Sequence, residues 1–174
     1  MDRRAGTSTD QTALPGLPPV LGDTPRILIL GSFPGAASLR HAEYYGNPQN
    51  HFWKIIEALF SIDCHLPYPD RAARLCRHHI ALWDVIGSCI REGSADEQIK
   101  DPLFNPVAAF LAAHPSVQLV ALNGTAARRF YQQLCIPSPV PSVTLPSTSP
   151  ANTRFTFAEK VREWEIILTC PEGE

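Results

Sequence analysis

The sequence predicts an α/β protein with three layers, in which helices cover both faces of a central, mostly parallel four-stranded sheet. Two observations predict this class. Short apolar runs typical of strands alternate along the chain with longer helical patterns, which indicates repeated strand–helix–strand units. Apolar residues make up 44% of the 174 residues, enough for one ordinary globular core.

Four short apolar runs are predicted to be the strands. Residues 26–30, with the sequence RILIL, form a continuous apolar run that ends at Gly31, as a strand buried on both faces does. The other three runs are residues 80–85, 117–124 and 142–145. Because ligands of open α/β sheets bind beyond the carboxyl ends of the strands, a site is expected in the loops that follow these runs.

Five segments are predicted to be helices because of their apolar spacing and their capping residues. They are residues 51–62, 70–78, 106–113, 126–134 and 157–168. Asn105 is expected to cap the third helix, with Pro106 in its first position, and Thr125 is expected to cap the fourth. Residues 31–50, between the first strand and the first helix, are expected to form a loop.

Residues 1–24 are expected to form a loose, flexible tail, followed by a single domain at residues 25–174. The tail is rich in Pro, Thr and Gly and has no apolar signal-peptide core. No apolar run approaches the roughly 18 residues that span a membrane. Seventeen acidic and fifteen basic residues leave the chain near neutral, so contact with a nucleic acid requires a local patch.

The five cysteines are scattered and form no C-x-x-C pair, which argues against zinc and iron–sulfur sites. An odd number of cysteines without a signal peptide indicates reduced thiols in a cytoplasmic protein. The cysteines are therefore interpreted as structural residues, and the sequence predicts no metal site.

Unusual polar and aromatic residues are concentrated after the predicted strands. The turn at residues 31–35 matches neither the G-x-G-x-x-G nor the Walker pattern for nucleotide phosphates, and a plain strand-to-helix connection remains an alternative for it. Tyr45, in the following loop, is placed to stack on a flat ligand, and Asn47 and Asn50 offer amides that both donate and accept hydrogen bonds. Asn50 alternatively caps the helix that follows.

A second stiff loop, with the sequence LPSTSPAN, follows the last predicted strand. Ser147, Thr148 and Ser149 place three hydroxyls between two prolines, and hydroxyls and backbone amides in a stiff loop suit phosphate oxygens. An ordinary solvated turn is the alternative. Asp84 and Asn123 stand at the ends of the second and third predicted strands, where shaping a turn competes with binding a ligand.

Four segments occur in a fixed order: LILGSFPG with EYYGNPQNHFW, then LWDVIGSCIREGSADEQIK, LNGTAA and LPSTSPAN. Together they resemble the uracil-DNA glycosylase superfamily, and within it the hypoxanthine-DNA glycosylase branch. The first and last segments resemble the two active-site motifs of the superfamily. A more distant similarity extends to the mismatch-specific uracil and thymine glycosylases. The resemblance runs from about residue 26 to the C-terminal helix.

This resemblance implies a DNA repair glycosylase that flips a deaminated base out of the duplex and hydrolyses its N-glycosidic bond, leaving an abasic site. Hypoxanthine is the first expected base and uracil the second. The base would stack on Tyr45 in a pocket with few charges, because a neutral heterocycle must be desolvated there. The resemblance also implies no metal or organic cofactor, damaged DNA as the partner, and a monomeric intracellular protein that joins the nucleoid when it binds DNA.

The resemblance assigns roles to individual residues of the pocket. Phe33 stands where most of the superfamily has an acid or amide that handles the attacking water, so Asn50 is the expected catalytic residue, with Ser32 beside Phe33 in the catalytic set. The expected base-binding residues are Phe33, Tyr45, Asn47, Asp84 and Asn123. The Asp84 carboxylate is expected to accept from N1–H of hypoxanthine, or its backbone amide to donate to O6.

The resemblance also implies the contacts with DNA. Ser147, Thr148 and Ser149 are expected to bind the phosphates that flank the flipped nucleotide, and Ala151, Asn152 or Arg154 to fill the gap left in the duplex. Two other functions remain open. A non-catalytic DNA-binding protein of the same fold would explain Phe33 as the trace of a lost activity. A hydrolase of free nucleosides or nucleotides would use the same pocket without DNA.

Overall fold

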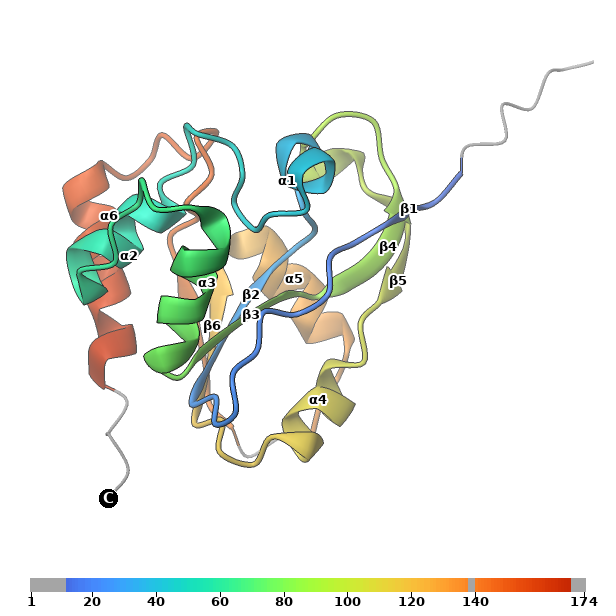
Figure 1. The fold of residues 1–174 in the computed structure, drawn as a ribbon. Coiled ribbons are helices and arrows are strands. Elements are labelled where there is room, and N and C mark those ends of the chain that lie inside the picture. Colours follow the sequence, from blue (N-terminus) through green and yellow to red (C-terminus); the bar gives the residue numbers. More distant parts are fainter. Residues whose placement is uncertain (1–11, 138–139, 170–174) are drawn as a thin grey trace, which may run out of the picture.

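The central sheet has four strands, and each neighbouring pair is parallel. The computed structural model describes residues 12–137 and 140–169, and Figure 1 shows the sheet between two layers of helices. The strand order is β3-β2-β6-β7, with bounds Ile80–Asp84 for β3, Ile27–Gly31 for β2, Leu119–Asn123 for β6 and Ser142–Leu145 for β7. The predicted α/β class with a mostly parallel four-stranded sheet is confirmed.

Strand β2 lies at the centre of the hydrophobic core. It pairs with β3 on one side and β6 on the other, and Leu28, Ile29 and Leu30 are completely buried. A strand covered on both faces does not alternate polar and apolar residues, which explains its unbroken apolar run. Gly31, which ends β2, lies opposite Asp84 in β3. The carboxyl ends of these two strands therefore meet at one edge of the sheet.

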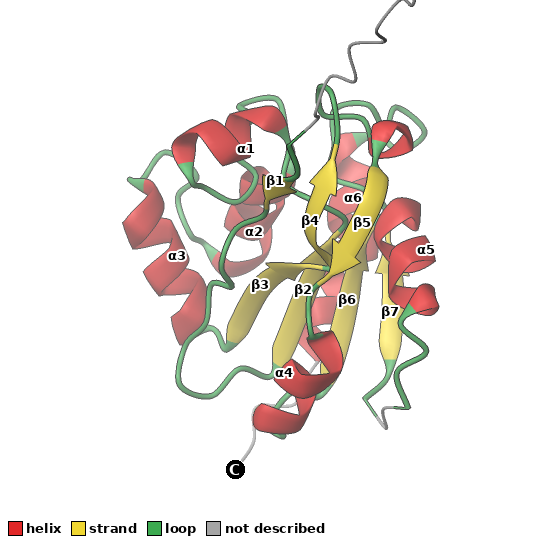
Figure 2. Ribbon diagram, turned by 90° about the vertical axis from the view of Figure 1, so that its right-hand side faces the viewer, coloured by secondary structure: helices red, strands yellow, loops and turns green. Residues whose placement is uncertain are grey.

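Six α-helices lie in the described part of the chain, and five of them are predicted from the sequence. Figures 1 and 2 show α2, α3 and α6 on one face of the sheet and α4 and α5 on the other. The bounds are Ala36–His41 for α1, Phe52–Phe60 for α2, Tyr68–Arg77 for α3, Val107–Ala113 for α4, Thr125–Gln133 for α5 and Phe157–Trp164 for α6, with 3-10 turns η1 at Asp96–Gln98 and η2 at Glu165–Thr169. Helix α1 lies in the segment expected to be a loop, and its six residues are too few to show apolar periodicity. None of these helices is long and apolar enough to cross a bilayer.

A hairpin that the sequence does not predict follows β3. Strands β4 (Ile86–Ile90) and β5 (Lys100–Phe104) pair antiparallel, and a short strand β1 (Leu14–Pro15) pairs with the other edge of β4. Figure 2 shows this second sheet in front of the main one. Pro102 within β5 and two shifts of register between β4 and β5 weaken the strand pattern, so sequence reasoning finds only a loop here.

The expectation of a loose tail at residues 1–24 is wrong for residues 12–24, which are held against the rest of the fold. The amide of Gly16 donates to the carbonyl of Gly87 over 2.7 Å, and Val20 and Leu82 exchange hydrogen bonds of 2.9 and 3.0 Å. Strand edges offer unpaired backbone groups, and those of β3 and β4 hold this segment. The folded unit therefore begins before residue 25. Residues 1–11, the rest of the predicted tail, lie outside the described residues.

Two predicted helix caps have a different role in the structure. The Asn105 side chain does not cap α4; its amide donates to the carbonyl of Asp84 over 2.8 Å, and Pro106 takes the cap position. Thr125 is the first residue of α5, and Gly124, with a φ of 97°, takes the cap position there. Asn105 thus connects the start of α4 to the strand end where the candidate site lies.

Candidate active site

A cavity of about 590 Å³ opens at the carboxyl ends of β2, β3 and β6. All four segments that follow the predicted strands contribute to its wall. The predicted site residues in the wall are Ser32, Phe33, Tyr45, Asn47, Asn50, Asp84, Asn123, Ser147, Thr148, Ser149 and Ala151. The other two, Asn152 and Arg154, are not part of the wall. The fold therefore brings nearly the whole predicted set to one place.

The carboxyl group of Asp84 is buried in the cavity wall. A Cβ atom at Gly31 would lie 2.4 Å from Asp84 Oδ1, so glycine at this position leaves room for the carboxyl group. Asp84 Oδ2 has no hydrogen-bond partner among the described residues. Burial, and then the charge of Asp96, raises the pKa of Asp84 to about 8 against the opposing effect of Arg91. At pH 7 Asp84 is therefore a neutral acid with an O–H donor beside a carbonyl acceptor.

Tyr45 presents a buried phenol to the same cavity. Its backbone adopts a φ of 56°, a left-handed conformation that is uncommon outside glycine. Its ring stacks on Phe52 with the ring centres 4.0 Å apart, which leaves only the other face for a flat ligand. The hydroxyl has no hydrogen-bond partner within the described ranges. Burial and the nearby Asp84 raise the pKa of Tyr45, while Asn123 has a smaller opposite effect, so the phenol is neutral.

Asn50 does not take the cap position of α2, which is held by His51, but its Oδ1 accepts from the amide of Phe52 over 2.9 Å and so supports the start of the helix. Asn50 also lines the cavity, and its side-chain nitrogen remains as a donor for a ligand. Support of the helix start and a role at the cavity are therefore compatible. Asn47 lies nearby and is exposed, with its Oδ1 accepting from the amide of Gln49 over 2.9 Å.

Phe33 is buried beneath a guanidinium group that the sequence analysis does not single out. The guanidinium carbon of Arg91 lies 4.9 Å from the centre of the Phe33 ring. Arg91 follows β4, is only 6% exposed, and donates to the carbonyl of Gly93 over 3.1 Å and to the carbonyl of Pro34. Burial lowers the pKa of Arg91. Arg91 thus clamps the loop after β4 onto the turn after β2.

Asp96 is a second residue that the sequence analysis misses. It begins the η1 turn between β4 and β5, lines the cavity, and accepts a hydrogen bond of 2.6 Å from the Ser32 hydroxyl. Burial raises the pKa of Asp96, while the Ser32 hydrogen bond and Arg91 lower it. The residue lies inside one of the four quoted segments, but only the unpredicted hairpin brings it back to the strand ends.

The Ser/Pro loop, residues 146–152, is held from behind by the half-buried Asn123 and the buried Trp164. Asn123 Oδ1 accepts from the amide of Thr148, and Asn123 Nδ2 donates to the Thr148 hydroxyl, both over 3.0 Å. Trp164 in α6 donates its ring N–H to the carbonyl of Pro146 over 3.0 Å. Asn123 therefore supports this loop, and its expected contact with the base stays a prediction.

Hydroxyl groups are the donors that the Ser/Pro loop keeps for a ligand. The amide of Ser149 donates to the Ser147 hydroxyl oxygen and the amide of Ala151 to that of Ser149, both over 3.2 Å. The amide of Asn152 donates to the carbonyl of Ser149 over 3.0 Å. These three amides are used within the loop, so the O–H groups of Ser147 and Ser149 remain as donors for a ligand.

Lys160 in α6 is completely buried beneath this loop. Its ammonium group donates to the carbonyl of Asn152 over 3.0 Å and lies 3.4 Å from Nδ1 of His51, whose own amide donates to the carbonyl of Thr148 over 2.9 Å. Burial lowers the pKa of Lys160 and of His51. Across the described ranges Lys160 forms no ion pair with a carboxylate, so its charge acts on the loop from behind.

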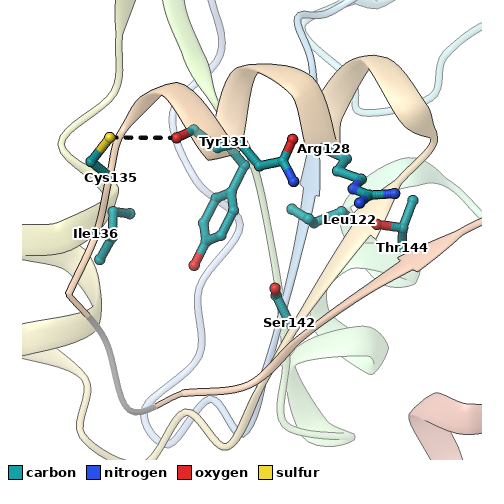
Figure 3. Close-up of a pocket in the computed structure, with 8 residues that line it drawn as sticks. Leu122, Arg128, Tyr131, Cys135, Ile136, Ser142 and Thr144 are labelled. Carbon is teal, nitrogen blue, oxygen red and sulfur yellow. Dashed lines mark hydrogen bonds between the residues drawn. The ribbon is translucent and has the colours of Figure 1, made fainter.

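A second hollow, of about 390 Å³, lies between α5 and β7 and is shown in Figure 3. Its lining residues are Leu122, Arg128, Tyr131, Gln132, Cys135, Ile136, Ser142 and Thr144. No predicted site residue is among them. The ligand-type atoms of Asp63, Cys64 and His65 lie within 4.8 Å of one another, but none of these residues lines the cavity at the strand ends. The candidate chemistry is therefore assigned to that cavity.

Comparison with known proteins shows which family this fold and cavity belong to. Residues 18–167 match the family model of the Uracil DNA glycosylase superfamily, and the chain belongs to this superfamily. Hypoxanthine DNA glycosylase from Methanosarcina acetivorans is 35% identical over 154 residues, which are 88% of this chain and 96% of that protein. Hypoxanthine DNA glycosylase from Methanosarcina barkeri is 40% identical over 110 residues, 63% of this chain and 70% of that one.

The same relationship is evident in three dimensions. The solution NMR structure of a Methanosarcina acetivorans protein, provisionally assigned as a uracil DNA glycosylase, superposes with a TM-score of 0.79 at 34% identity and covers 90% of this chain and 96% of that one. The resemblance seen in the four sequence segments and the expected uracil-DNA glycosylase fold are thus confirmed.

Asp84→Asn is expected to make the protein more stable, and increasingly so as the pH rises. Folding raises the pKa of Asp84 from 3.8 to about 8, so between these values the folded protein keeps a proton that the unfolded chain releases. Wild-type stability therefore falls through this window, whereas asparagine does not titrate. By pH 8 the free energy of unfolding of Asp84→Asn is expected to exceed that of wild type by about 2–5 kcal/mol. Urea denaturation of both proteins at pH 5, 6.5 and 8 measures this difference in stability. A difference that does not change with pH would contradict the raised pKa of Asp84.

Proposed function

We propose that this protein is a monofunctional DNA glycosylase that flips a deaminated base into the cavity and hydrolyses its N-glycosidic bond, with hypoxanthine as the preferred base and uracil as the second. Three buried side-chain polar atoms of the described residues have no hydrogen-bond partner, and two of them, Asp84 Oδ2 and the Tyr45 hydroxyl, belong to residues of the cavity wall; this pair is the observation that carries the proposal. The two relatives named hypoxanthine DNA glycosylase support the choice of base. The enzyme acts as an intracellular monomer and needs no cofactor.

Base recognition follows from the neutral state of Asp84. Hypoxanthine presents an N1–H donor next to the O6 acceptor, and a protonated carboxyl group presents an acceptor next to a donor. The two groups form a pair of hydrogen bonds without burying a net charge, which an ionised carboxylate would not do. Uracil has the same combination of N–H and C=O on a smaller ring, which accounts for its second place in a cavity of about 590 Å³.

Asn50 positions the attacking water in this proposal. Phe33 offers only hydrocarbon at the place where most of the superfamily has a polar side chain, and the Oδ1 of Asn50 is occupied by the Phe52 amide. The side-chain nitrogen of Asn50 therefore donates to the water oxygen and holds it near the sugar. The sugar gains positive charge as the base departs, so the rate depends on polar groups fixed in advance around that charge.

A panel of oligonucleotides tests the proposed function. Duplexes with one deoxyinosine, one deoxyuridine or only normal bases, together with free deoxyinosine, are incubated with the protein, and alkali then cleaves abasic sites. Cleavage is expected at deoxyinosine, more slowly at deoxyuridine, and not in normal DNA. Free deoxyinosine is expected to persist, because it has no phosphates for the Ser/Pro loop. Equal hydrolysis of the nucleoside would indicate a nucleoside hydrolase, and cleavage of none of the DNA substrates would indicate a non-catalytic DNA-binding protein.

Two substitutions separate the roles of Asn50. Serine also accepts a hydrogen bond at a helix start, so Asn50→Ser is expected to keep the stability that Asn50→Ala loses, about 1 kcal/mol. Both variants lack the amide donor and are expected to lower the single-turnover rate by about 10²–10³-fold. Urea denaturation and single-turnover cleavage of deoxyinosine DNA measure the two effects. An Asn50→Ser protein with the wild-type rate would mean that Asn50 only supports the start of the helix and has no role in catalysis.

The salt dependence of DNA binding is expected to be shallow. Hydroxyl groups rather than cations provide the contacts of the Ser/Pro loop, and log K falls by about 0.9 per neutralised phosphate for each unit of log salt, so a slope of about −2 to −4 is expected. Arg154→Ala should flatten the slope by about one unit if this exposed residue meets a phosphate. Ser147→Ala, the matched neutral control, should weaken binding at an unchanged slope. A slope near −8, measured by fluorescence anisotropy, would exclude a neutral interface.

A further inference from the structure

The reaction needs a proton acceptor that neither Phe33 nor Asn50 supplies. Hydrolysis adds the oxygen of water to C1′ of the deoxyribose, and a proton of that water must be taken up. A phenyl ring has no lone pair for it, and a carboxamide is too weak a base to accept it at neutral pH. The cavity wall therefore requires another basic group within reach of the turn that carries Phe33.

The pair of Ser32 and Asp96 lies at that turn. Ser32 directly precedes Phe33 and is 8% exposed. Its hydroxyl donates to Asp96 Oδ1 over 2.6 Å, a length typical of a hydrogen bond to an ionised carboxylate, and both residues line the cavity. The carboxylate thus reaches the end of β2 from the β4–β5 hairpin, 64 residues along the chain.

Several contacts fix Asp96 in this position. Arg91 donates to the carbonyls of Gly93 and Pro34, which ties the loop before Asp96 to the turn after Ser32. The Ser94 hydroxyl oxygen accepts from the amide of Ala36 over 2.9 Å, a second tie between the same loop and the start of α1. A catalytic group needs this kind of support, because small displacements reduce catalytic rates strongly.

The two acids of the cavity have different surroundings. Asp84 has a pKa of about 8 and holds a proton at pH 7, and the charge of Asp96 contributes to that value. Burial raises the pKa of Asp96, and the charge of Glu97 adds to this effect. The hydrogen bond from Ser32 and the charges of Arg91 and Arg129 act in the opposite direction.

We propose that Asp96, acting beside the Ser32 hydroxyl, is the general base that deprotonates the attacking water. This inference rests on the glycosylase activity proposed above. The bond between C1′ and the base nitrogen breaks, and its electron pair leaves with the base, which is protonated by solvent. The water oxygen bonds to C1′ while one of its protons passes to the Asp96 carboxylate and then to solvent. One water is consumed, the free base and an abasic sugar are formed, and no oxidant or other reactant is needed.

The proposed base, Asp96, lies at a different position in the fold from the water-handling side chain of most of the superfamily. The superfamily position that Phe33 occupies is expected to hold the water-handling side chain, and here the carboxylate comes from a separate hairpin. The negative charge of Asp96 would also stabilise the positive sugar as the base departs. Asn50 and Asp96 then have complementary roles, since the first holds the water oxygen and the second takes its proton.

Single-turnover cleavage of deoxyinosine DNA by Asp96→Asn tests the proposal, with Glu97→Gln as the matched control on the same turn. Asp96→Asn is expected to lower the rate by at least about 10²-fold while DNA affinity and melting temperature change little, and Glu97→Gln is expected to keep the wild-type rate. Rates are compared from pH 5 to 8, because removing the Asp96 charge also lowers the pKa of Asp84. The wild-type rate should rise with pH on the acidic side, and this rise should be lost in Asp96→Asn.

Chemical rescue provides a second, independent variant. Formate added to Asp96→Ala restores a small carboxylate at the cavity and is expected to raise the rate, with no effect on wild type or on Asn50→Ala. A purely structural Asp96 would show neither this rescue nor the altered pH profile. A wild-type rate in Asp96→Asn, or no formate rescue of Asp96→Ala, would overturn the role of Asp96 alone. A wild-type protein that cleaves no lesion in the oligonucleotide panel would overturn the proposed function and this inference together.

Discussion

The architecture of the site depends on the burial of one carboxyl group, that of Asp84, without a contacting ion-pair partner. Desolvation is unfavourable for a carboxylate, and the group responds by holding a proton at neutral pH. Room for it exists because β2 ends in Gly31, and Asn105 anchors its backbone from the start of α4. A neutral acid can meet a neutral heterocycle without leaving a charge stranded in the cavity. In the proposed function, the preference for a deaminated base, which carries an N–H next to a carbonyl, follows from this constraint.

Two cations of the site, Arg91 and Lys160, lie behind the surface of the cavity rather than in its wall. Arg91 lies against Phe33, and Lys160 lies under the Ser/Pro loop with a carbonyl and an imidazole nitrogen as its contacts. Cations in such positions act over a few ångströms through a medium of low polarity, where their influence is greater than in water. A protein with a formal net charge of −2 can therefore favour phosphate at one loop while its exposed surface stays nearly neutral. This arrangement suits recognition of one altered nucleotide better than strong attachment to any DNA.

Sequence reasoning recovered the main sheet, five helices and the residues that directly follow the strand ends. Those elements have strong local signals, such as the apolar run of β2 and the hydroxyls between two prolines after β7. It missed α1 and the β4–β5 hairpin, because six helical residues show no periodicity and a proline with register shifts interrupts the strand pattern. Arg91, Asp96 and Lys160 were missed for a different reason. Their importance lies in burial and in contacts with residues distant in sequence, and neither property is visible in a charged residue read locally.

The N-terminal segment has a consequence for how this protein can be shortened. Gly16 is close enough to the Phe33 ring that an added Cβ would lie 3.3 Å from it, and the Tyr44 hydroxyl donates to the carbonyl of Leu17 over 3.2 Å. A version that begins at the first strand of the main sheet would keep every residue of the cavity wall. It would nevertheless lose the outer support of Phe33 and Tyr44 and the strand that borders β4. The minimal working unit therefore includes the segment that supports the cavity from outside, and fusion partners are best joined ahead of strand β1.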